Sequence, residues 1–201
     1  MISAHYHNLD KALDESWRLM EEGVTNRRHG FHNGVAATIG LDGRPRARTV
    51  ILRSANRNEH SLVFHTDVRS RKIIELKSDP RLSMHFYDVT SKAQIRIDGV
   101  AHLHIENAFA HQRWDISQAM SRMCYSIQPA PGTPVEHADG YSIGNIETTL
   151  PQSLNKDFDN FAAVEVRVTS LEWLFLAREG HRRALFKWTE NDRIEQSWLV
   201  P

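Results

Sequence analysis

The sequence predicts a mainly β protein, an antiparallel barrel or sandwich with a few peripheral helices. Short segments in which apolar and polar residues alternate recur from residue 34 to the end of the chain. This period of two is typical of strands with one buried face. Turn signals separate the segments, and Asp42-Gly43 is the strongest of them. Segments with helical spacing are few and flank the strands, which favours an antiparallel fold with helical additions.

The first predicted element is an amphipathic helix over residues 9–22. Its apolar residues fall on one stripe, with acids between them: Leu9, Leu13, Trp17 and Met20. Gly23 follows directly and is a common type of residue at a helix end. The pattern therefore predicts a helix that stops at Gly23.

The remaining elements follow from the change of period after Gly34. Strands are predicted over residues 35–39, 46–53, 61–66, 82–87, 93–105, 163–168, 171–177 and 184–188, with 198–201 as a terminal edge. A short helix over 70–77 is ended by Asp79-Pro80. Residues 106–126 are predicted to be helical in two pieces. A proline-rich breaker follows at 129–134, and 135–160 is predicted to be loop.

The strand over residues 93–105 has the clearest alternation. Its odd positions are apolar: Ile95, Ile97, Ala101, Leu103 and Ile105. Its even positions are polar: Gln94, Arg96, Asp98, His102 and His104. One face of this strand is therefore predicted to lie in the core, and the other to be hydrated or functional.

Composition narrows the class of protein. The chain has 201 residues, with 25 basic and 25 acidic side chains and a formal charge of zero. This balance argues against a general nucleic-acid binder. No apolar run is long enough for a membrane span, and residues 1–8 lack the apolar core of a signal peptide. These observations predict a cytoplasmic protein with no nucleic-acid or membrane partner.

Cysteine and histidine usage predicts neither a disulfide nor a metal site. Cys124 is the single cysteine, so an internal disulfide is excluded, and we expect it to be a small buried residue. Among the 12 histidines, His102 and His104 share a strand face and His85 could lie on a neighbouring strand. Further ligands are not specified, so a hydrated strand face is the preferred interpretation.

The segment FHTDVRSRK, residues 64–72, predicts an anion site. A strand ends at Thr66 and a helix opens just after it, with three cations in its first turn: Arg69, Arg71 and Lys72. Cations are unfavourable at a helix N-terminus unless an anion is bound there. Thr66 and Ser70 add hydroxyl donors at the same rim. The alternative is a solvated basic turn whose side chains point away.

Two further segments favour the bound anion. In RTVILR, residues 48–53, alternation places Arg48 on the same face as Val50 and Leu52, where a guanidinium needs a partner. A phosphate suits its planar fork, and an internal ion pair with an acid is the alternative. In QIRIDG, residues 94–99, Gln94 on the polar strand face can both donate and accept hydrogen bonds, which matches the edge of a flavin ring. An ordinary surface residue is the alternative.

Taken in order, RTVILR, FHTDVRSRK, SDP and QIRIDG resemble the pyridoxine/pyridoxamine 5'-phosphate oxidase family. The resemblance covers residues 30–105, and the closing WLVP, residues 198–201, resembles the end of the family. It implies an antiparallel Greek-key split β-barrel that forms one FMN-binding domain over residues 1–201, with a divergent part from 106 onwards. It also implies a homodimer with FMN at the subunit interface.

The resemblance also implies roles for individual residues. The FMN phosphate would be held by Arg48, Arg71 and Lys72 with help from Thr66 and Ser70. The isoalloxazine ring would meet Thr49, Val50, Ile51, His65 and Gln94. His65 stands where the family usually has tyrosine, and Arg53 where it has the lysine that faces the substrate phosphate. His181 and Arg182 partly resemble the terminal substrate motif of the family.

These residues predict an FMN-dependent oxidoreductase that acts on a small, possibly anionic molecule. No catalytic acid or base can be named from the sequence. Two alternatives stay open, because the substrate motif in the second half of the chain departs from that of the oxidases. One is a flavin-binding protein with a sensing or storage role and no turnover. The other is a related split barrel that binds haem.

Overall fold

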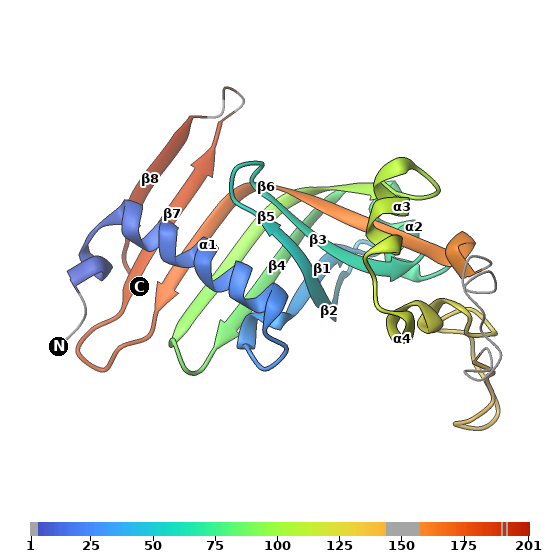
Figure 1. The fold of residues 1–201 in the computed structure, drawn as a ribbon. Coiled ribbons are helices and arrows are strands. Elements are labelled where there is room, and N and C mark those ends of the chain that lie inside the picture. The colour runs from blue at the N-terminus through green and yellow to red at the C-terminus, as the bar shows by residue number, and fades with distance from the viewer. Residues whose placement is uncertain (1–3, 144–156, 190, 192) are drawn as a thin grey trace.

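The computed structural model describes residues 4–143, 157–189, 191 and 193–201 (Figure 1). Eight strands form one antiparallel sheet: β1 Asn33–Ile39, β2 Pro45–Asn56, β3 Ser61–Asp67, β4 Arg81–Asp88, β5 Ala93–His104, β6 Phe161–Phe175, β7 Arg182–Trp188 and β8 Ile194–Leu199. The helices are α1 Leu9–Thr25, α2 Arg71–Ser78, α3 Ala108–Asp115 and α4 Ala119–Arg122. Single 3-10 turns lie at Ala4–His7, Gly30–His32, Met123–Tyr125 and Asp157–Asn160.

The first six strands close into a barrel. Their order is β3-β2-β1-β4-β5-β6, and β3 pairs with β6 to complete the ring. Because β4 returns to lie beside β1, the first four strands have the Greek-key order. β7 and β8 continue the sheet beyond the barrel, from the C-terminal half of β6. The prediction of a mainly β antiparallel barrel with peripheral helices is confirmed.

The core is built from the inward faces of these strands. On β5, Ile95 and Ile97 are fully buried and Ala101 nearly so, as the alternation predicted. The barrel residues form one buried cluster with the apolar stripe of α1. In that stripe, the ring of Trp17 packs against the rings of His60 and Trp188. α1 is therefore held against the barrel and the β7 extension by the residues that predicted its amphipathic face.

A second buried cluster attaches α3 to the outside of the barrel. It joins α3 to β3 and β6: Val63, Ala110, Trp114, Tyr125, Phe158, Phe161 and Ala163. Alternate residues of β3 belong to the two clusters, since Leu62 and Phe64 face the barrel interior and Val63 faces α3. β3 is thus covered on both faces, which explains why its sequence is apolar almost throughout.

Gly23 does not end α1, contrary to the sequence prediction. The helix continues to Thr25, with Asn26 as its C-cap. Gly23 is buried inside the helix, where a Cβ atom would lie 2.7 Å from the carbonyl carbon of Phe31. The glycine is therefore explained by close packing of the following turn on the helix.

The predicted boundaries in the C-terminal half need three corrections. Residues 163–168 and 171–177 are not two strands but lie in and just after β6, one long strand with a register shift opposite Asp98 and Gly99. β8 begins at Ile194, earlier than predicted. Residues 157–160, placed in a loop, form a 3-10 turn. The rest of that predicted loop is irregular at 135–143, and 144–156 lie outside the described residues.

Cys124 is exposed, so the prediction of a buried small residue is wrong. It lies in the turn after α4, on the rim of the cavity described below. Of the histidines considered as ligands, His104 lies 3.3 Å from Glu165 and stacks on Phe109. In the described part of the chain, no group of three His, Cys, Asp or Glu residues is arranged to hold a metal ion. None of the described helices has the length and apolar character to cross a membrane.

Candidate functional site

A cavity of about 400 Å³ lies between the barrel and the segment that follows α3. Five parts of the chain meet there, namely the loop after α1, β2, β3, the start of α2 and the region of α4. Its lining is Arg27, Thr49, Val50, Ile51, Arg53, His65, Lys72, Gln118, Met120, Ser121, Cys124 and Tyr125. Its volume is in the range typical of small-molecule and cofactor sites. Six of the residues predicted from the sequence meet in this cavity: Thr49, Val50, Ile51, Arg53, His65 and Lys72.

The start of α2 presents hydroxyl and ammonium donors together. Ser70 occupies the N-cap position but makes no side-chain capping bond. Its hydroxyl instead lies 3.2 Å from the Thr66 hydroxyl. The Lys72 Nζ donates to both hydroxyls, at 2.8 Å to Thr66 and 3.2 Å to Ser70. The first turn of the helix is therefore left with donors that can receive an anion.

Among the described residues, no acid bonds directly to the Lys72 ammonium. Burial lowers the pKa of this ammonium, and the neighbouring Arg48 guanidinium lowers it further. The carboxylates of Asp67 and Glu75 oppose this shift only in part. The net lowering means that the positive charge is held at some cost in free energy. A bound anion would remove that cost, since an opposite charge at short range favours the charged form. The donors and the charge at this helix end therefore fit a phosphate group.

Arg48 makes an internal ion pair, which was one of the two alternatives left open by the sequence. Its Nη2 donates to Oε2 of Glu75 at 2.7 Å. Its Nη1 donates to the Thr38 hydroxyl at 2.5 Å. The side chain is nevertheless close enough to lower the pKa of Lys72. Arg48 is therefore held in an ion pair with Glu75, and its positive charge still acts on Lys72 at the start of α2.

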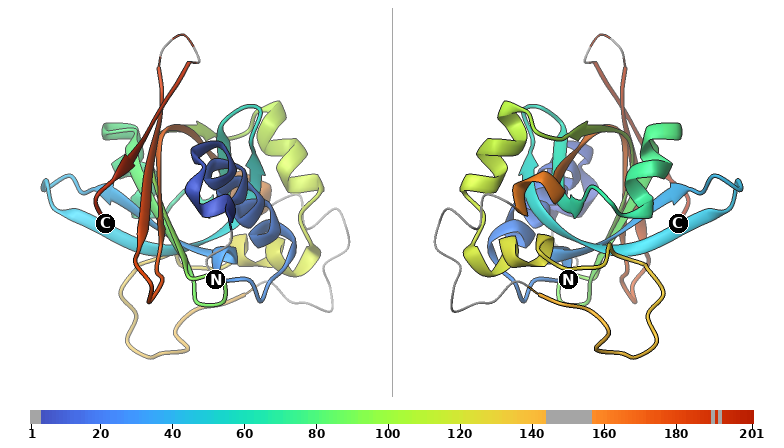
Figure 2. Two further views of the ribbon diagram at one scale, coloured as in Figure 1. Left: turned by 90° about the vertical axis from the view of Figure 1, so that its left-hand side faces the viewer. Right: turned by 90° about the vertical axis from the view of Figure 1, so that its right-hand side faces the viewer.

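The other two cations of the turn point elsewhere. Arg71 is exposed and lines a separate cavity of about 280 Å³ between α2 and the β1–β2 hairpin. Figure 2 shows this hairpin projecting beside α2. Arg69 pairs with Asp67 at 2.7 Å and donates to the carbonyl of Ile127. Of the three cations in the turn, Lys72 is the one that lines the cofactor-sized cavity. The predicted role of Arg71 in holding the phosphate stays a prediction.

A smaller cavity of about 220 Å³ adjoins the first and is strongly basic. Arg27, Arg53 and Arg113 all line it. It shares five residues with the larger cavity: Arg27, Arg53, His65, Gln118 and Ser121. No Asp or Glu appears among the described residues that line either cavity. Within the described residues, the Arg53 side chain makes no hydrogen bond or ion pair. The Arg113 Nε is buried without a partner, and its guanidinium lies over the Phe109 ring.

His65 lies between these arginines, and its imidazole is held neutral. Its ring packs edge-on against Phe161, and its Nε2 is buried without a hydrogen-bond partner in the described structure. Burial lowers the pKa of His65 to about 3, and the charges of Arg53 and Arg113 act in the same direction. A neutral ring with an unsatisfied nitrogen is a group that a ligand in either cavity can complete.

Stability should therefore depend on pH through His65. An unfolded histidine binds its proton near pH 6.5, whereas the folded side chain does so only near 3. Between these values the unfolded chain holds one more proton, so the free energy of unfolding falls as the pH is lowered, by up to about 1.4 kcal/mol per pH unit. In urea unfolding from pH 7 to 4, His65→Gln should show a shallower decline than the wild type. The exposed His137→Gln is the control and should keep the wild-type slope.

Three predicted site residues, Gln94, His181 and Arg182, lie away from the 400 Å³ cavity and the 220 Å³ cavity that adjoins it. Gln94 is on β5, paired with Tyr87 of β4 and Leu174 of β6. His181 and Arg182 lie at the β6–β7 turn, where His181 accepts from the Ala177 amide and Arg182 donates to the Gly180 carbonyl. Figure 1 shows β7 at the opposite end of the molecule from α3 and α4. Within one chain, the fold does not bring these residues to the cavity.

The α3–α4 region and the loop after α1 contribute residues that were not predicted from the sequence. Those with polar side chains are Arg27, Arg113, Ser117, Gln118, Ser121, Cys124 and Tyr125. A signal was available for one of them. Arg113 and Ser117 are four residues apart, which places them on one face of a helical segment, next to the buried Trp114. Arg27 offered no local signal, because its position depends on how α1 docks.

Fold and site together define a class of protein, an antiparallel β-barrel with a basic, cofactor-sized cavity whose donors fit a phosphate. Comparison with known proteins agrees. Residues 14–105 match the family model for pyridoxamine 5'-phosphate oxidase, FMN-binding domain. Over these residues, just under half of the chain, the protein is similar to the FMN-binding domain of the pyridoxamine 5'-phosphate oxidase family.

Two enzymes named pyridoxine/pyridoxamine 5'-phosphate oxidase illustrate the sequence similarity. Oxidase 2 of Arabidopsis thaliana is 38% identical over 105 residues, which cover 49% of this chain and 52% of that protein. The oxidase of Granulibacter bethesdensis is 36% identical over 136 residues, which cover 63% of this chain and 64% of that protein. The matched part thus spans about half to just under two thirds of these relatives.

Solved structures show the same fold over nearly the whole chain. An oxidase-related FMN-binding protein from Nostoc punctiforme has a TM-score of 0.73 and 19% identity, covering 94% of this chain and 96% of that one. PhzG from Burkholderia lata also has a TM-score of 0.73 and 19% identity, covering 100% and 98%. These likenesses establish the split-barrel architecture.

Proposed function

We propose that this protein binds FMN in the 400 Å³ cavity and is an FMN-dependent oxidoreductase for a small anionic substrate. The observation that carries the proposal is the charge of the two adjoining cavities. They are lined by Arg27, Arg53, Lys72 and Arg113 and by no acid among the described residues, in a chain whose formal charge is zero. Cations gathered without counter-charges are costly unless anions bind among them.

The cofactor phosphate belongs at the start of α2. Lys72, Thr66 and Ser70 supply an ammonium and two hydroxyls, and Arg48 adds positive charge from behind. Thr49, Val50 and Ile51 form the wall of β2 along which the flavin ring would lie. When bound, FMN supplies the redox chemistry, and the protein provides orientation and charge.

The substrate belongs in the smaller cavity. Arg53 and Arg113 have guanidinium groups without an acid partner in the described structure, and Arg27 completes the set. A carboxylate or phosphate fits between such planar donors. His65, kept neutral, lies where the two cavities meet. Burial also raises the pKa of Tyr125, so its phenol keeps its proton. The lining therefore binds and orients the substrate with cations and neutral donors.

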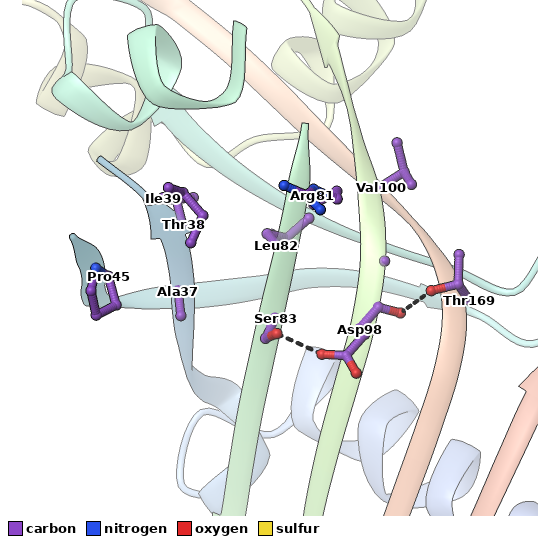
Figure 3. Close-up of a pocket in the computed structure, with 11 residues that line it drawn as sticks. Ala37, Thr38, Ile39, Pro45, Arg81, Leu82, Ser83, Asp98, Val100 and Thr169 are labelled. Carbon is purple, nitrogen blue, oxygen red and sulfur yellow. Dashed lines mark hydrogen bonds between the residues drawn. The ribbon is translucent and has the colours of Figure 1, made fainter. Parts of the chain in front are cut away.

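We propose further that two copies of the chain form the complete site. The outward face of β1, β4 and β5 has an open groove of about 690 Å³, lined by apolar residues around Ser83 and Asp98 (Figure 3). This face is continuous with the flavin wall, because Val35 of β1 pairs with both Thr49 of β2 and His85 of β4. A second copy on this face could bring its Gln94 to the flavin ring.

Purified protein tests the function directly. We expect a yellow, dimeric protein with a flavin spectrum, bleached by a reductant and restored by air. With pyridoxamine 5'-phosphate or pyridoxine 5'-phosphate as a trial anionic substrate, turnover is read as hydrogen peroxide. Arg53→Ala should raise KM at least about tenfold and leave FMN retained, since it removes a charged partner of the substrate. The exposed Arg44→Ala is the control.

Other outcomes would redirect the proposal. A flavin spectrum without turnover on any anionic trial substrate would favour a sensing or storage role. A haem spectrum, or a colourless protein that does not take up added FMN, would rule the proposal out. A monomer by light scattering would contradict the two-copy site while leaving the phosphate site of the single chain to be tested by titration.

A further inference from the structure

Glu75 is a buried acid within α2 itself, and its location is unusual for an anion site. The side chain is buried in the second turn of α2, only 6% exposed. One carboxylate oxygen, Oε2, accepts from both the Thr38 hydroxyl, at 2.6 Å, and Arg48 Nη2, at 2.7 Å. Because Arg48 Nη1 also donates to the Thr38 hydroxyl, the three side chains form a closed ring of hydrogen bonds.

This ring fixes the Arg48 guanidinium in one place. Nη1 of Arg48 donates to the Thr38 hydroxyl and the Ala36 carbonyl, and Nη2 makes one bond, to Glu75. A guanidinium has five N–H donors, so donors remain for a further acceptor. Without Glu75, the charge of Lys72 would repel Arg48, because the two cations are close enough for the Arg48 charge to lower the pKa of Lys72.

We propose that Glu75 is a positioning residue for the cofactor phosphate, holding Arg48 beside Lys72 so that both cations are in place before the phosphate arrives. This inference rests on the proposed FMN site. The expected effect of losing Glu75 on phosphate affinity is the opposite of what charge repulsion alone predicts. A carboxylate near a phosphate repels it, so loss of its charge alone would tighten binding. Loss of its positioning role would weaken binding, since Arg48 would have to be ordered on binding.

The test is a titration of cofactor-free protein with FMN and, separately, with riboflavin, followed by flavin fluorescence. Riboflavin lacks the phosphate, so the ratio of the two Kd values isolates the phosphate contribution. Glu75→Gln should raise the Kd for FMN about tenfold and change that for riboflavin by less than about threefold. Glu21→Gln, at an exposed acid of α1, is the matched control and should change neither value.

Thr38→Val provides a second variant in case Glu75→Gln does not fold. It removes the bridging hydroxyl and keeps both charges, so it should also weaken FMN selectively, by a few-fold. In addition, Glu75→Gln combined with Arg48→Gln should lower FMN affinity no more than Arg48→Gln alone, because Glu75 acts through Arg48.

The outcomes separate this inference from the function on which it rests. If the wild type binds neither flavin, both fail. If the wild type binds FMN but Glu75→Gln tightens FMN, leaves it unchanged, or weakens FMN and riboflavin equally, the positioning role fails and the FMN site stands.

Discussion

Lys72→Ala should raise the Kd for FMN about 30- to 100-fold, because it removes a charged donor to the phosphate. The side chain is the one cation of the turn at residues 69–72 that lines the cofactor-sized cavity, and it already contacts the Thr66 and Ser70 hydroxyls. The fold should be unaffected. The native ammonium is held with a lowered pKa, so its loss removes an unfavourable term from the cofactor-free protein.

Variants of two neighbouring cations, Lys77 and Arg71, show whether the effect on FMN binding is specific to Lys72. Lys77→Ala removes an exposed lysine from the last turn of the same helix and should leave the Kd unchanged. The double variant Arg71→Ala with Lys72→Ala is expected to lose retained FMN altogether. Comparison with the single variants then measures the share of Arg71, whose side chain lines the other cavity. Stoichiometric FMN retained by the double variant would refute the phosphate site.

Trp114→Ala should lower the free energy of unfolding by about 3–5 kcal/mol, the usual cost of emptying a buried aromatic position. Trp114 is 2% exposed and packs against Tyr125, Phe158 and Phe161 at the centre of the second buried cluster. That cluster attaches the α3–α4 segment to the barrel, and this segment contributes Arg113 and Gln118 to the cavities. The same variant should therefore also weaken FMN and substrate binding.

A second tryptophan gives the matched control for Trp114→Ala. Trp198 lies on the outer strand β8 and is 41% exposed. Trp198→Ala should cost well under half as much, because less apolar surface is lost from the core. Guanidinium unfolding of the two variants at one pH measures the difference. Equal effects would mean that the α3 segment is not held by the second cluster.

Local patterns were enough to predict most of the barrel. Alternation in residues 93–105 identified the inner face of β5, and Asp42-Gly43 identified the hairpin, where Gly43 has a φ of +75°. Both signals depend only on residues that are close together in the chain, so they can be recognised from the sequence. Gly23 misled because its role depends on a contact outside the local pattern, a close approach to Phe31, which lies beyond the helix.

The sequence by itself determined most of the strands, the basic turn at the start of α2 and the resemblance to an oxidase family. These depend on residue order over a few positions, and the periodicity of the chain records them. Only the tertiary structure decided which charges meet. It paired Arg48 with Glu75, turned Arg71 away from Lys72, and brought Arg27, Arg53 and Arg113 together from three distant segments. Charge pairing acts through space, and no pattern along the chain encodes a distance between segments that are far apart in sequence.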